Sequence, residues 1–296
     1  MGEITPHERY ANFYTDFAFK KLFGTEANKM CLISFLNALL DGKEEITDLI
    51  YLNVEHLGHA AAERKAVFDV LCENPQGEKF LIEMQKAEQE YFIDRSIYYS
   101  TFPIQEQAPQ GKWNFKLNKV YTIGILNFIF DDTDDNYMHH EVKLMDTKKN
   151  AVFYDKLTYV YLEMPKFKKE ESELETFFDK WLYAMKNLYR LLDRPAALQE
   201  AVFKRFFEQA EIANFTIDER RDYRESQKDY WDLNAVMETA EKRGHEEGRA
   251  EGRAEGRAEG RKERNAEIAR GMKADNIPAS VIAKYTGLTE EEITEL

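Results

Sequence analysis

The sequence has little cysteine. Cys31 and Cys72 are the two cysteines in 296 residues, and both lie within apolar patterns. Disulfide-stapled folds are dense in cysteine, and structural zinc sites need clustered cysteine or histidine ligands, so neither class is indicated. We expect two buried, reduced thiols and a cytoplasmic setting.

Long hydrophobic runs are missing as well. There is no stretch of membrane-spanning length and no N-terminal apolar run followed by a cleavage site, so we expect neither membrane insertion nor secretion. Hydrophobic residues make up 43% of the chain and aromatic residues 13%. These values and the length predict a globular protein with one α/β domain and an appended helical region.

An excess of basic charge is also absent. The chain has 41 Lys and Arg residues against 55 Asp and Glu residues, which gives a formal net charge of −14. This balance argues against wrapping nucleic acid over a broad surface, because the phosphates would be repelled. It leaves room for a local basic cleft.

The most informative stretch is a predicted β-hairpin. Two apolar runs, 65–72 and 79–85, flank a turn that contains Pro75 and Gly77. Side chains alternate between faces along a strand, so pairing about Gln76 gives one apolar face and one face with two opposed acids. The predicted pairs are Cys72 with Phe80, Val70 with Ile82 and Phe68 with Met84, then Leu71 with Leu81, Asp69 with Glu83 and Val67 with Gln85.

The facing acids, Asp69 and Glu83, need an explanation. Like charges opposite one another across strands are destabilising. Either this register is wrong, one acid is protonated, or a cation lies between them, and Mg²⁺ is commonly held by one or two carboxylates. On spacing alone, a solvated sheet face is the more ordinary interpretation.

The same residues carry a family resemblance. Asp69, thirteen intervening residues and then Glu83-Met84-Gln85 resembles the PD-(D/E)XK nuclease pattern, with Phe68 in place of its Pro and Gln85 in place of its Lys. With the preceding segment DFAFKKLFG (16–24), the chain is similar to the Rpn branch of recombination-promoting nucleases and transposases. The likeness runs from about residue 15 to residue 167.

The resemblance implies a restriction-endonuclease-like α/β core, a mixed central sheet flanked by helices, followed by a helical C-terminal region. It implies an Mg²⁺-dependent DNA endonuclease linked to recombination, mobile elements or phage defence, with Mn²⁺ as the alternative metal. Asp69, Glu83 and the Met84 backbone carbonyl would hold the ion, and Gln85 would position the attacking water. A neutral amide cannot supply the charge of the family's Lys, so the metal or another cation must carry more.

Two further residues are candidates for the site. A helix predicted over 87–102 leaves the second hairpin strand directly and could project Arg95 beside the metal, where its fork suits a phosphate. A surface position or pairing with a nearby acid is equally open for Arg95. Asp16 lies four residues before Lys20 on a helix predicted over 12–23, either as a surface ion pair or as a contact to metal-bound water or phosphate.

Periodicity predicts the remaining elements. Helices are expected over 28–40, 173–188, 196–210 and 230–241, and strands over 46–57, 120–130, 139–144 and 157–164. We expect a nuclease core at 1–170, a helical accessory region at 171–243, a spacer helix at 244–264 and a small helical tail at 265–296.

The spacer consists of Glu-Gly-Arg-Ala units with a period of four. Each Gly costs a helix about 1 kcal/mol relative to Ala, and apolar a and d positions are missing, so a standard coiled coil is not supported. The tail favours protein contacts, and the helical C-terminal region predicts a homo-oligomer.

A rival hypothesis makes the chain a catalytically degenerate scaffold that acts as an interaction or regulatory module. The missing Lys and the acidity favour this rival, whereas intact Asp69 and Glu83 favour the nuclease. A strand-joining transposase is less supported, because no third acidic ligand is arranged for that chemistry.

Overall fold

The computed structural model describes residues 8–52, 55–56, 66–108, 111–131 and 133–296. Contacts within the chain divide it into two units, 1–231 and 232–296. Helix α6 (Ile217–Ala274) begins in the first unit and continues into the second.

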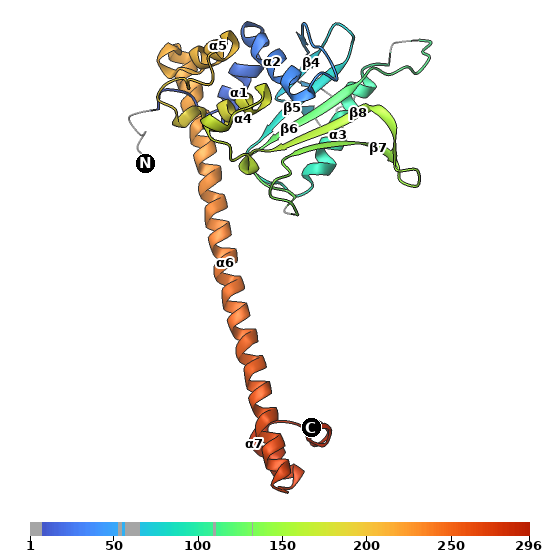
Figure 1. Ribbon diagram of the computed structural model, residues 1–296, viewed down its shortest axis with the longest axis vertical. Coiled ribbons are helices and arrows are strands. Elements are labelled where there is room, and N and C mark those ends of the chain that lie inside the picture. The colour runs from blue at the N-terminus through green and yellow to red at the C-terminus, as the bar shows by residue number, and fades with distance from the viewer. Residues whose placement is uncertain (1–7, 53–54, 57–65, 109–110, 132) are drawn as a thin grey trace. The chain divides into compact units, whose positions relative to one another are not determined.

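The first unit is built on a mixed sheet. Its strands are β1 (Ile50–Tyr51), β4 (Val70–Glu73), β5 (Lys79–Gln85), β6 (Val120–Leu126), β7 (His139–Asp146) and β8 (Ala151–Glu163). Their order is β1-β4-β5-β6-β8-β7, in which β5, β6 and β8 are parallel and the other neighbours are antiparallel (Figure 1). Strands β2 (Glu55–His56) and β3 (Ala66–Val67) pair separately.

Helices cover both faces of this sheet. The α-helices are α1 (Asp16–Phe23), α2 (Lys29–Leu40), α3 (Phe92–Gln105), α4 (Phe177–Asn187) and α5 (Ala201–Ala210). Helix α3 lies on one side, and α1, α2, α4 and α5 gather on the other (Figure 1). Single-turn 3-10 helices lie at Glu26–Asn28, Met164–Lys166, Glu171–Glu173, Leu188–Arg190 and Ile212–Asn214. A mixed sheet between helices confirms the predicted fold class.

The main core fills the side of the sheet that faces α1, α2, α4 and α5. Alternate residues of β5 and β6 enter it, and aromatic rings from the helices pack around Trp181. The Trp181 ring lies 4.8 Å from Phe203 and 5.2 Å from Phe206, measured between centroids. Helices α4 and α5 therefore belong to the core of the first unit.

The hairpin register is confirmed where β4 and β5 pair. The structure aligns Val70 with Ile82, Leu71 with Leu81 and Cys72 with Phe80, as the apolar alternation predicts. The prediction is wrong upstream of Val70.

The chain bends at Asp69, and β4 begins one residue later, so the expected pairs of Phe68, Asp69 and Val67 are not part of the ladder. Phe68 packs with Leu71 and Leu81 on the α3 face, opposite to the face expected for it. The physical reason is that the Asp69 carboxylate, rather than a backbone carbonyl, takes the N–H of Met84.

Local hydrogen bonds shorten other predicted elements. Helix α1 starts at Asp16 instead of residue 12, because the Thr15 hydroxyl accepts from the N–H of Ala18 and caps the helix. The strand predicted over 46–57 is reduced to β1 and β2, because Asn37 bonds both backbone groups of Ile46. Residues 53–54 and 57 of that prediction lie outside the described residues.

Helix α3 also begins late, at Phe92 instead of residue 87. Tyr91 adopts a left-handed conformation with φ of 64°, which prevents a continuous helix from crossing it. The helix then runs through the buried Pro103 to Gln105, past its expected end. This start determines which helical residues face the end of β5.

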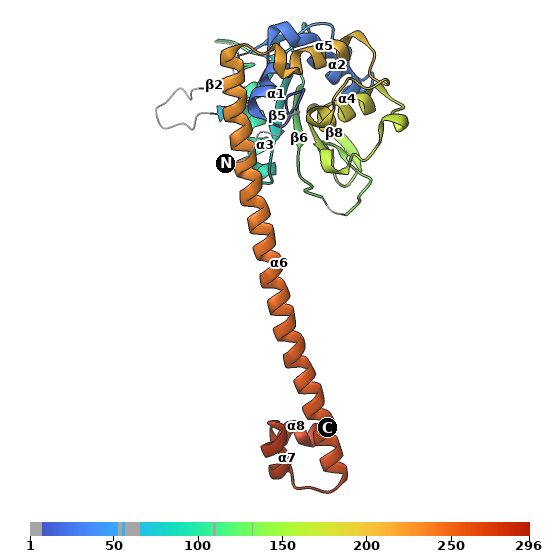
Figure 2. The same cartoon turned by 90° about the vertical axis from the view of Figure 1, so that its left-hand side faces the viewer.

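The second unit has a small core of its own. Helices α7 (Ala279–Thr286) and α8 (Glu290–Glu295) lie beside the C-terminal end of α6 (Figure 2). Ala269, Ile282 and Ile293 are buried between them. Thr289 caps α8, because its hydroxyl accepts from the N–H of Glu292. The Glu-Gly-Arg-Ala repeat is helical and exposed within α6.

Replacing Phe206 by alanine tests the main core. Phe206 is fully buried against Trp181, so Phe206→Ala should lower the free energy of unfolding by about 3–5 kcal/mol. The matched control is Phe153→Ala on β8, which removes a ring that is 79% exposed and should change stability by less than about 0.5 kcal/mol. Denaturant unfolding of both variants measures the difference. Equal losses would contradict this core.

Candidate functional site

Asp69 occupies the bend just before β4. Its side chain is partly buried, and its Oδ2 atom accepts a hydrogen bond of 2.9 Å from the backbone N–H of Met84 on β5. The N–H and C=O of one strand residue point to the same edge of the strand. The Met84 carbonyl is therefore directed to the edge of β5 where Asp69 lies.

Glu83 lies on β5, on the face of the sheet that α3 covers. Its neighbour on β6 is Gly124. The side chain of Glu83 is partly buried, and its Oε2 atom accepts a 2.8 Å hydrogen bond from Gln85 Nε2. One carboxylate oxygen is thus bonded to the side-chain amide of Gln85, the residue that stands where the family pattern has Lys.

Arg95 of α3 completes a chain of hydrogen bonds. Its Nη2 atom donates to Gln85 Oε1 at 2.5 Å, and Nη1 donates to Gln89. The guanidinium carbon lies 5.8 Å from the centroid of the Tyr99 ring. Arg95 therefore faces the end of β5, and its bonds go to amides rather than to the nearby acids considered as alternatives.

Asp69 and Glu83 lie close enough for their charges to interact. Burial raises the pKa of Glu83, and the charge of Asp69 raises it further, to about 8, although Arg95 and Gln85 oppose the shift. Burial also raises the pKa of Asp69, while the Met84 N–H lowers it. These shifts mean that each carboxylate resists ionisation in the metal-free protein, which a bound cation would reverse.

Helix α1 borders this pair. Asp16 and Lys20 form an ion pair of 2.8 Å, and both side chains are about half exposed. The charge of Asp16 raises the pKa of Asp69, whereas Lys20 and Lys86 lower it, so all three lie near Asp69.

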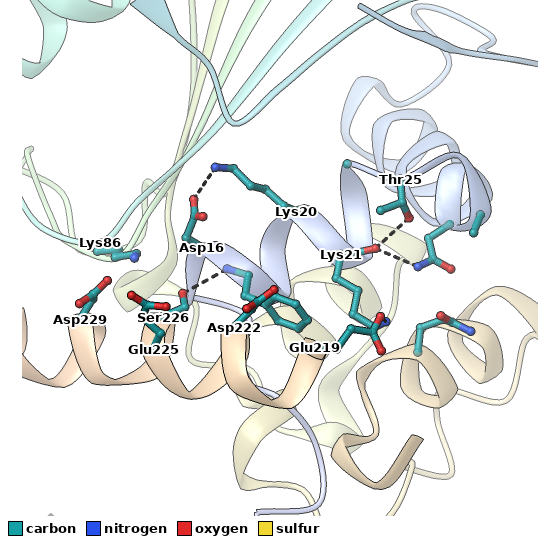
Figure 3. Close-up of a pocket in the computed structure, with 15 residues that line it drawn as sticks. Asp16, Lys20, Lys21, Thr25, Lys86, Glu219, Asp222, Glu225, Ser226 and Asp229 are labelled. Carbon is teal, nitrogen blue, oxygen red and sulfur yellow. Dashed lines mark hydrogen bonds and ion pairs between the residues drawn. The ribbon is translucent and has the colours of Figure 1, made fainter. Parts of the chain in front are cut away.

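Asp16, Lys20 and Lys86 also line a cavity of about 890 Å³ (Figure 3). Figure 3 shows acids of α6 along its opposite wall, namely Glu219, Asp222, Glu225 and Asp229. Lys21 pairs with Glu219, and Ser226 accepts from the N–H of Phe17, so α6 is fastened to α1 here.

The structure thus places the predicted residues in two groups. Glu83, Gln85 and Arg95 are joined by hydrogen bonds, and Asp69 bonds the backbone of Met84. Asp16 is bonded to Lys20 and reaches Asp69 through its charge alone. Sequence reasoning missed Lys86, although its place directly after Gln85 was an available signal.

The two cysteines do not contribute a nucleophile. Cys31 and Cys72 are buried free thiols, as predicted. Burial raises the pKa of Cys31 to about 12 and that of Cys72 further, so neither is a thiolate near neutral pH.

The donor set suits a hard cation. Within the described ranges, no group of three or more His, Cys, Asp or Glu side chains is arranged to hold a metal. Asp69, Glu83 and the Met84 carbonyl supply oxygen atoms, and Mg²⁺ typically keeps several waters beside one or two carboxylates. The residues present therefore fit such an ion.

Comparison with known proteins identifies the family. A family model described as "PD-(D/E)XK nuclease family transposase" matches residues 13–240. The match covers most of the chain, so the chain belongs to this family, a class of nuclease-type hydrolases that generally use divalent metals. No curated protein and no solved structure matches it. In the described part of the chain, no helix is long and apolar enough to cross a membrane.

The raised pKa of Glu83 predicts a pH dependence. The ordinary value is 4.5 and the folded value about 8, so the protonated form favours folding. Its contribution is fully present below pH 4.5 and is lost as the pH rises through 8. In metal-free protein, the free energy of unfolding should fall between those limits relative to Glu83→Gln.

Urea unfolding of both proteins at a series of pH values checks this dependence. Asp155→Asn, which changes an exposed acid on β8, should follow the wild-type curve. Parallel curves for wild type and Glu83→Gln would show that Glu83 does not titrate abnormally.

Proposed function

We propose that the protein is a metal-dependent DNA endonuclease that hydrolyses phosphodiester bonds at the end of β5. The observation that carries the proposal is the proximity of Asp69 and Glu83, whose burial and mutual repulsion raise the pKa of Glu83 to about 8. A divalent cation would relieve that repulsion. Asp69, Glu83 and the Met84 carbonyl would hold Mg²⁺, or Mn²⁺ in its place.

When bound, such an ion polarises the phosphate and lowers the pKa of water. Gln85 and Arg95 would supply what the family's Lys supplies elsewhere. The Gln85 amide is fixed at both ends, since Nε2 donates to Glu83 and Oε1 accepts from Arg95. Its second N–H is available to orient the attacking water. Arg95 brings a permanent positive charge to the phosphate undergoing attack, and its fork can bond two phosphate oxygens.

Lys20 and Lys86 support a DNA substrate. Both line the cavity beside Asp69, on the wall opposite the acids of α6. A net charge of −14 disfavours extended DNA binding, so contacts are expected to concentrate on these local cations. Asp16 would orient Lys20 or a water at the metal.

The family description names transposases, so DNA of mobile elements is the proposed setting, with recombination or phage defence as its outcome. Cytoplasmic location and homo-oligomerisation through the helical C-terminal region belong to the same proposal. Light scattering of the full chain tests the oligomeric state.

A plasmid assay tests the site. With Mg²⁺, purified protein should nick supercoiled plasmid, and EDTA should stop the reaction. Asp69→Asn and Glu83→Gln each keep the shape of the side chain but remove a charged ligand, so cleavage should fall by more than about 100-fold. Gel analysis of the nicked product over time measures the rate.

The matched control is Asp155→Asn, which changes an exposed acid on the same sheet. This variant should cleave at the wild-type rate. Equal cleavage by all four proteins would point to a contaminant. The nuclease proposal would be contradicted if none of the four proteins cleaved plasmid, single-stranded DNA or RNA.

Replacing Arg95 separates its role from metal binding. Arg95→Ala should lower the cleavage rate by about 100-fold or more, because it removes a cation from the phosphate. Arg95→Lys should recover only part of the rate, since Lys lacks the planar fork. Arg190→Ala, which removes a cation stacked on Tyr189, serves as control. An unchanged rate in Arg95→Ala would remove Arg95 from the site.

A degenerate scaffold that binds a partner without cleavage is the second candidate. The acids of α6 favour it, because they line the same cavity as Lys20 and Lys86 and oppose the approach of phosphates. It predicts that no nucleic acid is cleaved under any metal condition.

A further inference from the structure

A small cavity lies behind Glu83, between the sheet and α3. Its volume is about 10 Å³, and Glu83, Thr122, Gly124, Ser96 and Tyr161 are among its lining residues. That volume is about what one water molecule needs. The cavity is separate from the larger one beside α1, because the two share no lining residue.

Gly124 lies at one edge of this cavity. On neighbouring strands, Gly124 is paired with Glu83 on one side and with Tyr161 on the other. A Cβ atom on Gly124 would lie 3.1 Å from the Tyr161 ring and 3.2 Å from Leu126, which is tighter than ordinary packing. Close packing therefore keeps a side chain out of this position, and Gly124 lines the cavity together with Glu83 and Thr122.

Thr122 supplies a buried polar group that no described residue satisfies. The residue is 3% exposed, and its Oγ1 atom has no hydrogen-bond partner among the described residues. Leaving a buried hydroxyl unpaired costs free energy, because water is lost without replacement. A partner inside the cavity would remove this cost.

Two other hydroxyls of the cavity, those of Ser96 and Tyr161, are bonded to each other. Ser96 donates its proton to the carbonyl of Ile93, so the short contact between Ser96 and Tyr161 is made by the Tyr161 proton. Both oxygens keep lone pairs but have no proton left to give. Glu83 uses Oε2 to accept from Gln85, and its carboxylate has further acceptor capacity.

We propose that this cavity binds one buried water, which accepts from Thr122 and donates to a carboxyl oxygen of Glu83 and to the Tyr161 oxygen. Three such bonds are typical of a buried water. Thr122 is then a positioning residue that holds Glu83 through the water, as Gln85 holds it directly. The water requires only the fold, whereas its effect on metal binding rests on the proposed function.

Thr122→Val tests the water, because valine keeps the shape and removes the hydroxyl. If Thr122 Oγ1 were unpaired, its removal would raise the melting temperature of the metal-free protein. If it holds a water, the melting temperature should fall. In a Glu83→Met background, where the water loses one of its two acceptors, the same change should have a smaller effect or the opposite sign.

Mn²⁺ binding, measured by calorimetry on the full chain, tests the positioning role. Removing a group that orients a metal ligand typically weakens metal affinity by about 10- to 100-fold, and Thr122→Val should do the same. Thr122→Ser keeps the hydroxyl and should bind Mn²⁺ within about threefold of wild type.

The two measurements test the buried water and the positioning role of Thr122 separately. A raised melting temperature in Thr122→Val would contradict the proposal that the cavity binds a water. A lowered one with unchanged Mn²⁺ affinity keeps the water and overturns the positioning role. If wild type binds no Mn²⁺ at all, the proposed function fails, and the melting temperatures in the two backgrounds still decide whether the water exists.

Discussion

The hydrogen bond from the Met84 N–H to Asp69 is the interaction on which the candidate site depends. It ends the β4–β5 ladder at Val70, three pairs before the predicted register would, because a side chain takes the N–H of Met84. The bend places an acid at the end of β5 without burying it in the apolar face. It also leaves the Met84 carbonyl outside the ladder, so two different oxygen donors meet at one edge.

Glu83 and Glu163 have pKa values shifted in opposite directions. Glu163 is fully buried, and burial raises its pKa, but Lys166, His140 and two backbone N–H groups outweigh burial and lower it. Glu83 is partly exposed and still has a raised pKa. Glu163 is a compensated structural acid that ties the loop after β6 to the sheet. For Glu83, Arg95 and Gln85 do not outweigh burial and the charge of Asp69. Such an acid is expected where a cation binds.

Periodicity in the sequence predicted part of the geometry of the candidate site. Apolar alternation gave the register from Val70 to Cys72, and with it the closeness of two acids. It could not give the bend at Asp69, because a single side-chain hydrogen bond leaves no periodic signal. Thr122 was also out of reach, since β6 lies beside β5 only after a connection of more than thirty residues that contains α3.

The exchange of Lys for Gln85 moves the positive charge from the strand to α3. Arg95 can reach Gln85 because Tyr91 turns the chain in a left-handed conformation and delays the start of the helix. A lysine at position 85 would place its ammonium against this guanidinium, and like charges in a partly buried site repel. Gln85 and Arg95 are therefore best understood as one unit. The helix start, rather than the strand alone, determines whether Arg95 reaches the position of the family's lysine.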